Sequence, residues 1–174
     1  MAKVETLQEL FVHEIRDLYD AERQLVRALP KVAQACQSKE LKTTVENHLE
    51  ETRRHVERLE HVFQALNVDP KGNGCEAMQG LIEEGEELIK NTDASPTRDA
   101  GLIGAAQRIE HYEMAGYGTA RAFAEALGHR EAVSRLQETL DEEGEANKKL
   151  NALALEKINM QAVEQSEAKS SARR

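Results

Sequence analysis

Glutamates recur at a matched spacing along this chain, each of them on or beside the apolar stripe of an amphipathic segment. Glu51 follows Glu22 by 29 residues, and Glu143 follows Glu113 by 30 residues. A buried carboxylate without a partner is so costly that it normally takes up a proton. Four helices that each direct one Glu to the same point therefore indicate a shared cation.

Pairs of residues one helical turn apart extend this set. Glu51 and His55 are four residues apart and Glu110 and Glu113 are three apart, so each pair shares a helix face. We expect Glu51 to bridge two ions and His55 to be the only nitrogen ligand. Two bridged ions could activate dioxygen or peroxide. The candidate metal ligands are Glu22, Glu51, His55, Glu110, Glu113 and Glu143.

The donor atoms of this set are mostly oxygens. Such a set suits iron or manganese, and tolerates magnesium or calcium, better than it suits structural zinc. We therefore predict iron, with two ions as one option and manganese or magnesium as alternatives.

The alternative is that these glutamates only solvate the helices. Charged residues make up 32% of the chain, so a single Glu is more often a surface residue than a ligand. We expect Glu142 to face water and His48 to pack as a polar residue rather than to bind metal. Tyr117 is expected in the core or as a hydrogen-bond donor beside the ligands.

Apolar residues at three- and four-residue spacing predict five helices. Ser38 and Ser95 are the expected N-caps, and Pro30 is expected to kink or interrupt the first helix near its end. We predict one domain over residues 1–165 and a polar, disordered tail over residues 166–174. The helices are expected over residues 6–37, 39–66, 76–90, 97–127 and 130 to the 160s.

An internal repeat indicates how these helices are arranged. An offset of 91 residues places Leu18 on Ile109 and Glu22 on Glu113, so that apolar and acidic positions coincide. Two similar helical hairpins would then be joined by the short helix over residues 76–90. The pattern predicts an all-α fold, a four-helix bundle with a short extra crossover helix.

Composition limits the partners and the compartment. The net charge of −9 argues against nucleic acid as a partner. No run of 18 apolar residues exists, so no membrane partner is expected. Cys36 and Cys75 form neither a disulfide framework nor a metal motif, which favours a reducing cytoplasm. Helices of this length are expected to leave apolar residues beyond one bundle, which favours a homodimer.

Several ordered motifs carry a resemblance to a known family over about residues 5–160. They are Leu-Tyr-Asp-Ala-Glu-Arg-Gln-Leu at 18–25, His-Leu-Glu-Glu-Thr at 48–52, Gly-Leu-Ile-Glu-Glu at 80–84, Ala-Ala-Gln-Arg-Ile-Glu-His-Tyr-Glu at 105–113, Tyr-Gly-Thr at 117–119 and Thr-Leu-Asp-Glu-Glu at 139–143. With these motifs the chain resembles the YciE/YciF stress-associated family of the ferritin-like superfamily.

The resemblance implies a ferritin-like bundle, commonly dimeric, with a di-iron centre as an option. Glu22, Glu51, Glu113 and Glu143 match the four main carboxylate positions of ferritin-like sites, and Glu110 matches a second Glu of rubrerythrin-like members. Two departures weaken the match. Arg stands at position 54, so the Glu-x-x-His spacing fails unless His55 substitutes, and Ala and Asn stand at 146 and 147 where a second His is usual.

Two functions therefore compete. The first is a cytoplasmic ferritin-like metal-binding protein of the stress response, with slow oxidase or peroxide-detoxifying activity. The second is a non-enzymatic structural or interaction protein that keeps the fold without a working metal site. Metal content separates the two hypotheses.

Overall fold

The computed structural model describes residues 4–171, and all regular structure within them is helical. The prediction of an all-α fold is confirmed. The elements are α1 (Leu7–Ala35), α2 (Lys39–Leu66), α3 (Glu76–Asn91), α4 (Pro96–Ala126), α5 (Arg130–Leu153), the π-helix η1 (Ala154–Ile158) and α6 (Asn159–Ser171).

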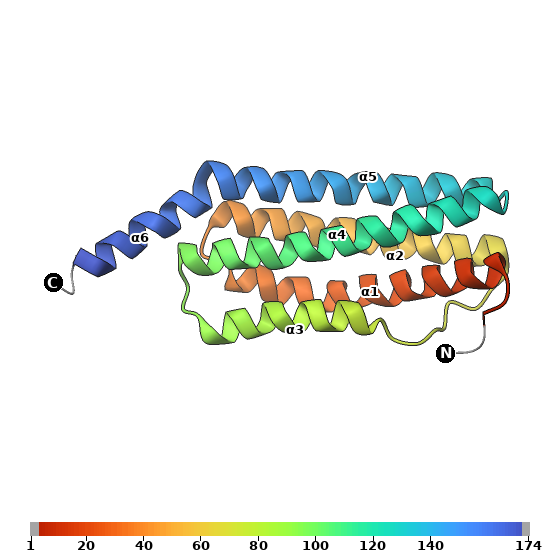
Figure 1. The fold of residues 1–174 in the computed structure, drawn as a ribbon, viewed down its shortest axis with the longest axis horizontal. Coiled ribbons are helices and arrows are strands. Elements are labelled where there is room, and N and C mark those ends of the chain that lie inside the picture. The colour runs from red at the N-terminus through yellow and green to blue at the C-terminus, as the bar shows by residue number, and fades with distance from the viewer. Residues whose placement is uncertain (1–3, 172–174) are drawn as a thin grey trace.

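Four long helices lie side by side along the molecule (Figure 1). Helix α1 packs against α2 and α4, and α5 packs against α4 and α2, so the four close a ring around a common interior. The shorter α3 packs against α1 and α4 from outside that ring. Chain segments far apart in sequence therefore face one another across the interior.

Side-chain caps fix where the helices begin. The Thr6 side chain accepts from the Glu9 backbone N–H, and the Glu9 carboxylate accepts from the Thr6 N–H, which is a complete capping box. Ser38 caps α2 and Ser95 caps α4, as predicted. Helix α1 runs through Pro30 without interruption and ends at Ala35. Packing of neighbouring Leu29 and Ala33 in the core offsets the backbone hydrogen bond that proline cannot donate.

The last helix leaves the bundle. Helix α5 passes through η1 into α6, which extends beyond the ends of its neighbours (Figure 1). Ala154 and Ile158 keep η1 anchored in the core. Residues 166–171, predicted as a disordered tail, are part of α6, and residues 172–174 of that tail lie outside the described part of the chain.

The apolar core has two parts with a polar zone between them. One cluster includes Leu25, Val45, Leu102 and Leu150, and the other includes Leu18, Leu59, Tyr117 and Leu136. Each long helix places buried charged or imidazole side chains between the two clusters. They are Glu22 on α1, His48 and His55 on α2, Glu110 and Glu113 on α4 and Glu143 on α5. Another buried carboxylate, Asp99, lies near the start of α4, outside this zone.

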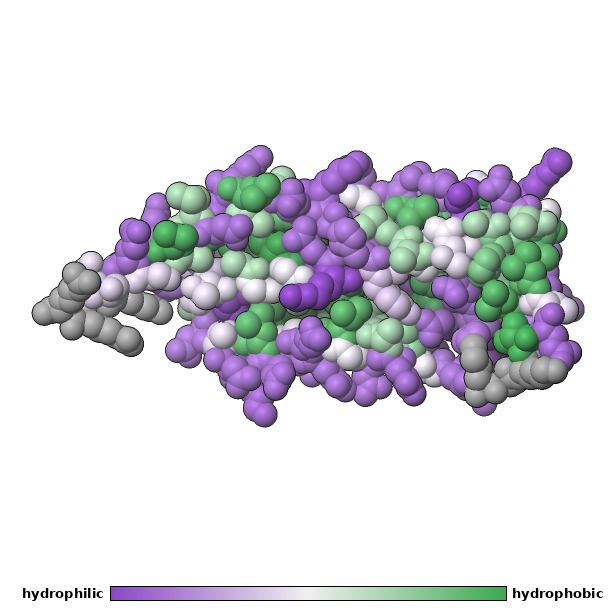
Figure 2. All heavy atoms as spheres, viewed as in Figure 1, coloured by the Kyte–Doolittle hydropathy of each residue, from purple (hydrophilic) through white to green (hydrophobic). Residues whose placement is uncertain are grey.

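The outer surface is mainly polar. Figure 2 shows hydrophilic residues over most of the visible face, with apolar patches among them. Within residues 4–171 no helix is long and apolar enough to cross a bilayer.

Candidate metal centre

Six acidic or imidazole side chains meet in the polar zone, and four helices supply them. Each is almost completely buried, with exposed fractions of 0 to 7%. Their donor atoms form two groups, in each of which the atoms lie within 4.8 Å of one another. The first group is Glu22, His55 and Glu143, and the second is His48, Glu110, Glu113 and Glu143.

The first group centres on the His55 ring. Its Nδ1 lies 3.3 Å from Oε1 of Glu22 and 2.9 Å from Oε1 of Glu143. The three residues come from α1, α2 and α5. The ring therefore presents one nitrogen to two carboxylates.

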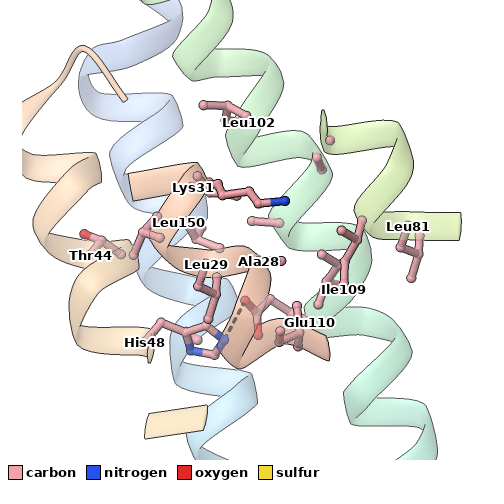
Figure 3. A pocket seen from close by; sticks show the side chains of 18 of the residues that line it. Ala28, Leu29, Lys31, Thr44, His48, Leu81, Leu102, Ile109, Glu110 and Leu150 are labelled. Carbon is pink, nitrogen blue, oxygen red and sulfur yellow. Dashed lines mark ion pairs between the residues drawn. The ribbon is translucent and has the colours of Figure 1, made fainter. Parts of the chain in front are cut away.

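The second group adjoins the first and centres on His48, which precedes His55 by two turns of α2. Its Nε2 lies 3.5 Å from Oε1 of Glu110 and 3.9 Å from Oε2 of Glu143. Figure 3 shows the His48 ring facing the Glu110 carboxylate. Glu143 belongs to both groups, with Oε1 toward His55 and Oε2 toward His48.

A third carboxylate holds the other ring nitrogen of His55. Its Nε2 lies 2.8 Å from Oε2 of Glu142. Arg58 donates to both oxygens of Glu142, over 2.5 Å and 3.0 Å. Glu142, expected to face water, is instead 29% exposed at its side chain and anchored between an imidazole and a guanidinium. This chain of contacts fixes the orientation of the ring.

A buried tyrosine orients the carboxylate of α1. Tyr117 Oη donates a 2.5 Å hydrogen bond to Oε1 of Glu22. Tyr117 is fully buried, as the sequence predicted for a core residue or a donor beside the ligands.

Several donor atoms in the two groups lack a hydrogen-bond partner among residues 4–171. Native proteins rarely leave buried polar atoms unpaired, so such a concentration requires an explanation. A cation between the carboxylates would satisfy these atoms together, and the donor set fits one. The atoms are Oε2 of Glu22, both ring nitrogens of His48, Nδ1 of His55, Oε2 of Glu110 and both oxygens of Glu113 and of Glu143.

The protonation pattern shows what the side chains do without a cation. Burial raises the pKa of Glu22, Glu110 and Glu113. Burial lowers the pKa of His55, but Glu22 and the other nearby carboxylates outweigh it and raise the value to about 12. For His48 the same opposition, led among the carboxylates by Glu110, raises the pKa to about 9. Without a metal ion, protons on the imidazoles and carboxylates thus balance the buried negative charge. A bound metal ion would displace these protons.

The structure brings together five of the six ligands predicted from the sequence: Glu22, His55, Glu110, Glu113 and Glu143. Glu51 is in neither group. Its side chain is 20% exposed, with Oε2 3.5 Å from Nδ1 of His48 and Oε1 3.7 Å from Nζ of Lys149. The position shared by both groups, predicted for Glu51, is held by Glu143.

His48, expected to pack, is the group member that sequence reasoning missed. A signal was present, because His48 and His55 are seven residues apart and so lie on one face of α2, two turns from each other. Their rings lie 6.5 Å apart, centroid to centroid.

Comparison with known proteins agrees with this architecture. Residues 6–163 match a family described as a domain of unknown function, DUF892. The chain is 44% identical over 160 residues to Protein YciF of Escherichia coli K12, covering 91% of this chain and 96% of that protein.

The chain belongs to the DUF892 family. A crystal structure of the E. coli stress protein YciF superimposes with a TM-score of 0.86, over 90% of this chain and 99% of that one, at 44% identity. YcfI of Rhodopseudomonas palustris gives a TM-score of 0.82 at 42% identity, over 86% of this chain and 96% of that one. A protein of Xanthomonas campestris shares only the fold, with a TM-score of 0.75 at 21% identity, over 93% of this chain and 99% of that one.

Proposed function

We propose that this DUF892 protein is a ferritin-like metal-binding protein of the stress response, with two cation positions that share Glu143. The observation that carries the proposal is the concentration of buried carboxylate oxygens and imidazole nitrogens that have no hydrogen-bond partner within residues 4–171 and face one another from α1, α2, α4 and α5. If these carboxylates had no ligand to bind, we would expect each of them to accept hydrogen bonds from protein groups or to contact solvent.

The two groups divide the ligands between the positions. Glu22, His55 and Glu143 would hold one ion, and His48, Glu110, Glu113 and Glu143 would hold the other. Each position then has one nitrogen donor among carboxylate oxygens, a set that favours iron or manganese over structural zinc. Bound iron would supply the redox chemistry for slow oxidation by dioxygen or for removal of peroxide.

The protein's own contribution is orientation and charge. A His55 ring that donates its Nε2 hydrogen to Glu142 has a lone pair on Nδ1, the atom that faces Glu22 and Glu143. Such a carboxylate–histidine arrangement fixes the tautomer and raises the basicity of the ligand. Arg58 holds Glu142 in place, and Tyr117 holds Glu22.

The arrangement of the helices supports the ferritin-like part of this proposal. The closed ring of α1, α2, α4 and α5, with α3 in the connection between the two hairpins, supports the four-helix arrangement with one crossover that the repeat predicts. The stress role rests on the likeness to YciF, which is described as a stress protein. The cytoplasmic compartment stays a prediction, based on the two free cysteines.

A second function, a structural or interaction protein without metal, is favoured by one observation. The raised pKa values of His48 and His55 mean that imidazolium groups can neutralise part of the buried negative charge. The fold could then persist with protons in place of ions.

Elemental analysis separates the two functions. Protein purified without a His-tag or chelator should contain iron or manganese at about two ions per chain. Glu143→Ala should remove the metal, while Glu138→Ala, whose side chain on the same helix is 60% exposed, should keep it. Wild-type protein that takes up neither iron nor manganese after metal reconstitution, at normal stability, would establish the structural alternative instead.

A further inference from the structure

An apolar cavity of about 160 Å³ lies among the helices beside His48 and Glu110, and exposed side chains such as Lys31 and Lys149 line its opening to solvent. We call it the α3 cavity, because α3 covers one side of it. Side chains from α1, α2, α3, α4 and α5 line it, including Leu25, Leu29, Val45, Leu102, Ile109 and Leu150. Figure 3 shows His48 and Glu110 at one end of this space, with the apolar side chains leading to them.

Small residues keep the space open. Ala28 on α1, Ala105 and Ala106 on α4 and Gly85 on α3 all line it. A Cβ added at Gly85 would lie 3.9 Å from the Cβ of Ala105, so α3 and α4 face each other here through little side-chain volume. Large apolar residues at these positions would have filled the interior, as they do elsewhere in the core.

Most of the lining is apolar, and the polar side chains among it include Thr44, Asn47 and two ion pairs. At the outer limit Lys31 of α1 and Glu86 of α3 form a 2.7 Å ion pair with exposed side chains. At another limit Lys149 lies 3.7 Å from Glu51. At the inner end Nε2 of His48 and Oε2 of Glu110 have no hydrogen-bond partner within residues 4–171. A molecule in the cavity would meet apolar walls along its length and these polar atoms at its end.

We propose that the α3 cavity binds a small, uncharged apolar molecule, about the size of one aromatic ring, beside His48 and Glu110. An apolar cavity of about 150 Å³ can accept a benzene-sized guest. A charged guest would lose hydration against the apolar part of these walls. The occupant is therefore defined by size and lack of charge.

This assignment names the substrate class of the proposed metal centre and in that sense rests on the proposed function. Binding itself needs no metal, because the apolar walls exist independently of the ligands. The two ideas can therefore fail separately.

The test uses metal-free protein and toluene as the probe, with benzoate as its charged counterpart. Calorimetric titration should show saturable binding of toluene and at least tenfold weaker binding of benzoate. In NMR spectra, magnetisation transfer from toluene protons should reach the methyl groups of Leu25, Leu29 or Leu102. This readout requires no variant, so it holds even if a substituted chain fails to fold.

Two substitutions fill the cavity from opposite walls. Ala28→Leu on α1 and Ala105→Leu on α4 should each weaken toluene binding at least tenfold. Ala122→Leu, at an exposed position of α4, should leave it unchanged. The proposal is overturned if toluene does not bind, binds no better than benzoate, or transfers magnetisation only to residues outside the cavity. Toluene binding by a chain that takes up no metal would support the cavity and overturn the metal centre alone.

Discussion

Tyr117 and Glu22 are joined across the interior, from α4 to α1, by a 2.5 Å hydrogen bond between two fully buried side chains. Tyr117→Phe removes the donor and frees the carboxylate to rotate. Loss of such an outer contact usually costs 10- to 100-fold in metal affinity, and we expect a loss of about tenfold in iron affinity. The free energy of unfolding should fall by about 1–2 kcal/mol.

Metal titration and urea denaturation measure these two effects. Tyr19→Phe is the matched control, because Tyr19 donates a 2.8 Å hydrogen bond to Glu60 at a part-buried position outside the two groups. Unchanged iron affinity in Tyr117→Phe would show that Glu22 needs no help to hold its position.

Glu143 and Glu51 are the two candidates for the carboxylate that bridges two ions. The sequence favours Glu51, while the geometry places Glu143 in both ligand groups. We expect Glu143→Ala to lose both ions and Glu51→Ala to lower occupancy less. The apo melting temperature should fall in Glu143→Ala, because a buried carboxylate that pairs with His55 over 2.9 Å is lost. It should change less in Glu51→Ala, because that side chain is 20% exposed. Elemental analysis measures the metal content of each variant, and calorimetry measures its melting temperature. Full loss of metal in Glu51→Ala alone would show that Glu51, as the sequence predicts, is the bridging ligand.

Glu142 acts on the site through His55. Glu142→Gln keeps the size of the side chain but removes the charge that meets the 2.8 Å contact with Nε2. Iron affinity should fall by 10- to 100-fold. Glu138→Gln, which removes the charge of the other carboxylate that Arg58 contacts, at an exposed position, should change iron affinity little. If both variants lower iron affinity equally, the contacts of Arg58, and not the contact between Glu142 and His55, determine iron affinity.

Cys36 should be slow to react with thiol reagents. Burial, and then the nearby Asp99 carboxylate, raise the pKa of Cys36 to about 12. Because a raised pKa keeps the thiol protonated, the thiolate is almost absent at pH 8, and alkylation should keep accelerating with pH up to about pH 12. Iodoacetamide labelling followed by mass spectrometry measures this rate. The same cysteine in guanidinium should react at an ordinary rate, and rapid labelling of the native chain would contradict the prediction.

The homodimer stays a prediction from the sequence. The largest exposed apolar side chains at the C-terminal end are Leu155, Met160 and Val163, with exposed fractions of 65%, 58% and 51%. Light scattering at micromolar concentration should give about twice the chain mass of 19.5 kDa. Leu155→Glu should lower that mass if this face lies in the interface. A wild-type mass of one chain would contradict the dimer.

The helices were predictable because their signals are local. Apolar spacing and caps such as Ser38 and Ser95 depend on residues a few positions apart, and the helices match them within a few residues. Of the two expectations for Pro30, a kink or an interruption, the interruption is wrong, because core packing, which is not local, holds α1 together around it.

From the sequence, the candidate site could be predicted only to the level of which helix face each residue occupies. Glu22, Glu113 and Glu143 lie on clear apolar stripes, so their burial followed from the pattern. The choice between Glu51 and His48, three residues apart on α2, depends on the rotation of that helix against α4 and α5. A shift of part of one turn decides which side chain points inward, and the sequence of one helix does not contain that rotation.

The π-helix between α5 and α6 determines the rotation of α6 about its own axis. The buried residues Leu150, Ala154 and Ile158 follow one another at four-residue steps, which would drift around an α-helix of 3.6 residues per turn. The wider turn, closed by the Asn159 N–H and the Ala154 carbonyl oxygen, absorbs that drift. Deleting one residue there would turn α6 by about 100° about its axis. The side of α6 that the protein offers to its surroundings is thus determined by a single residue of chain length.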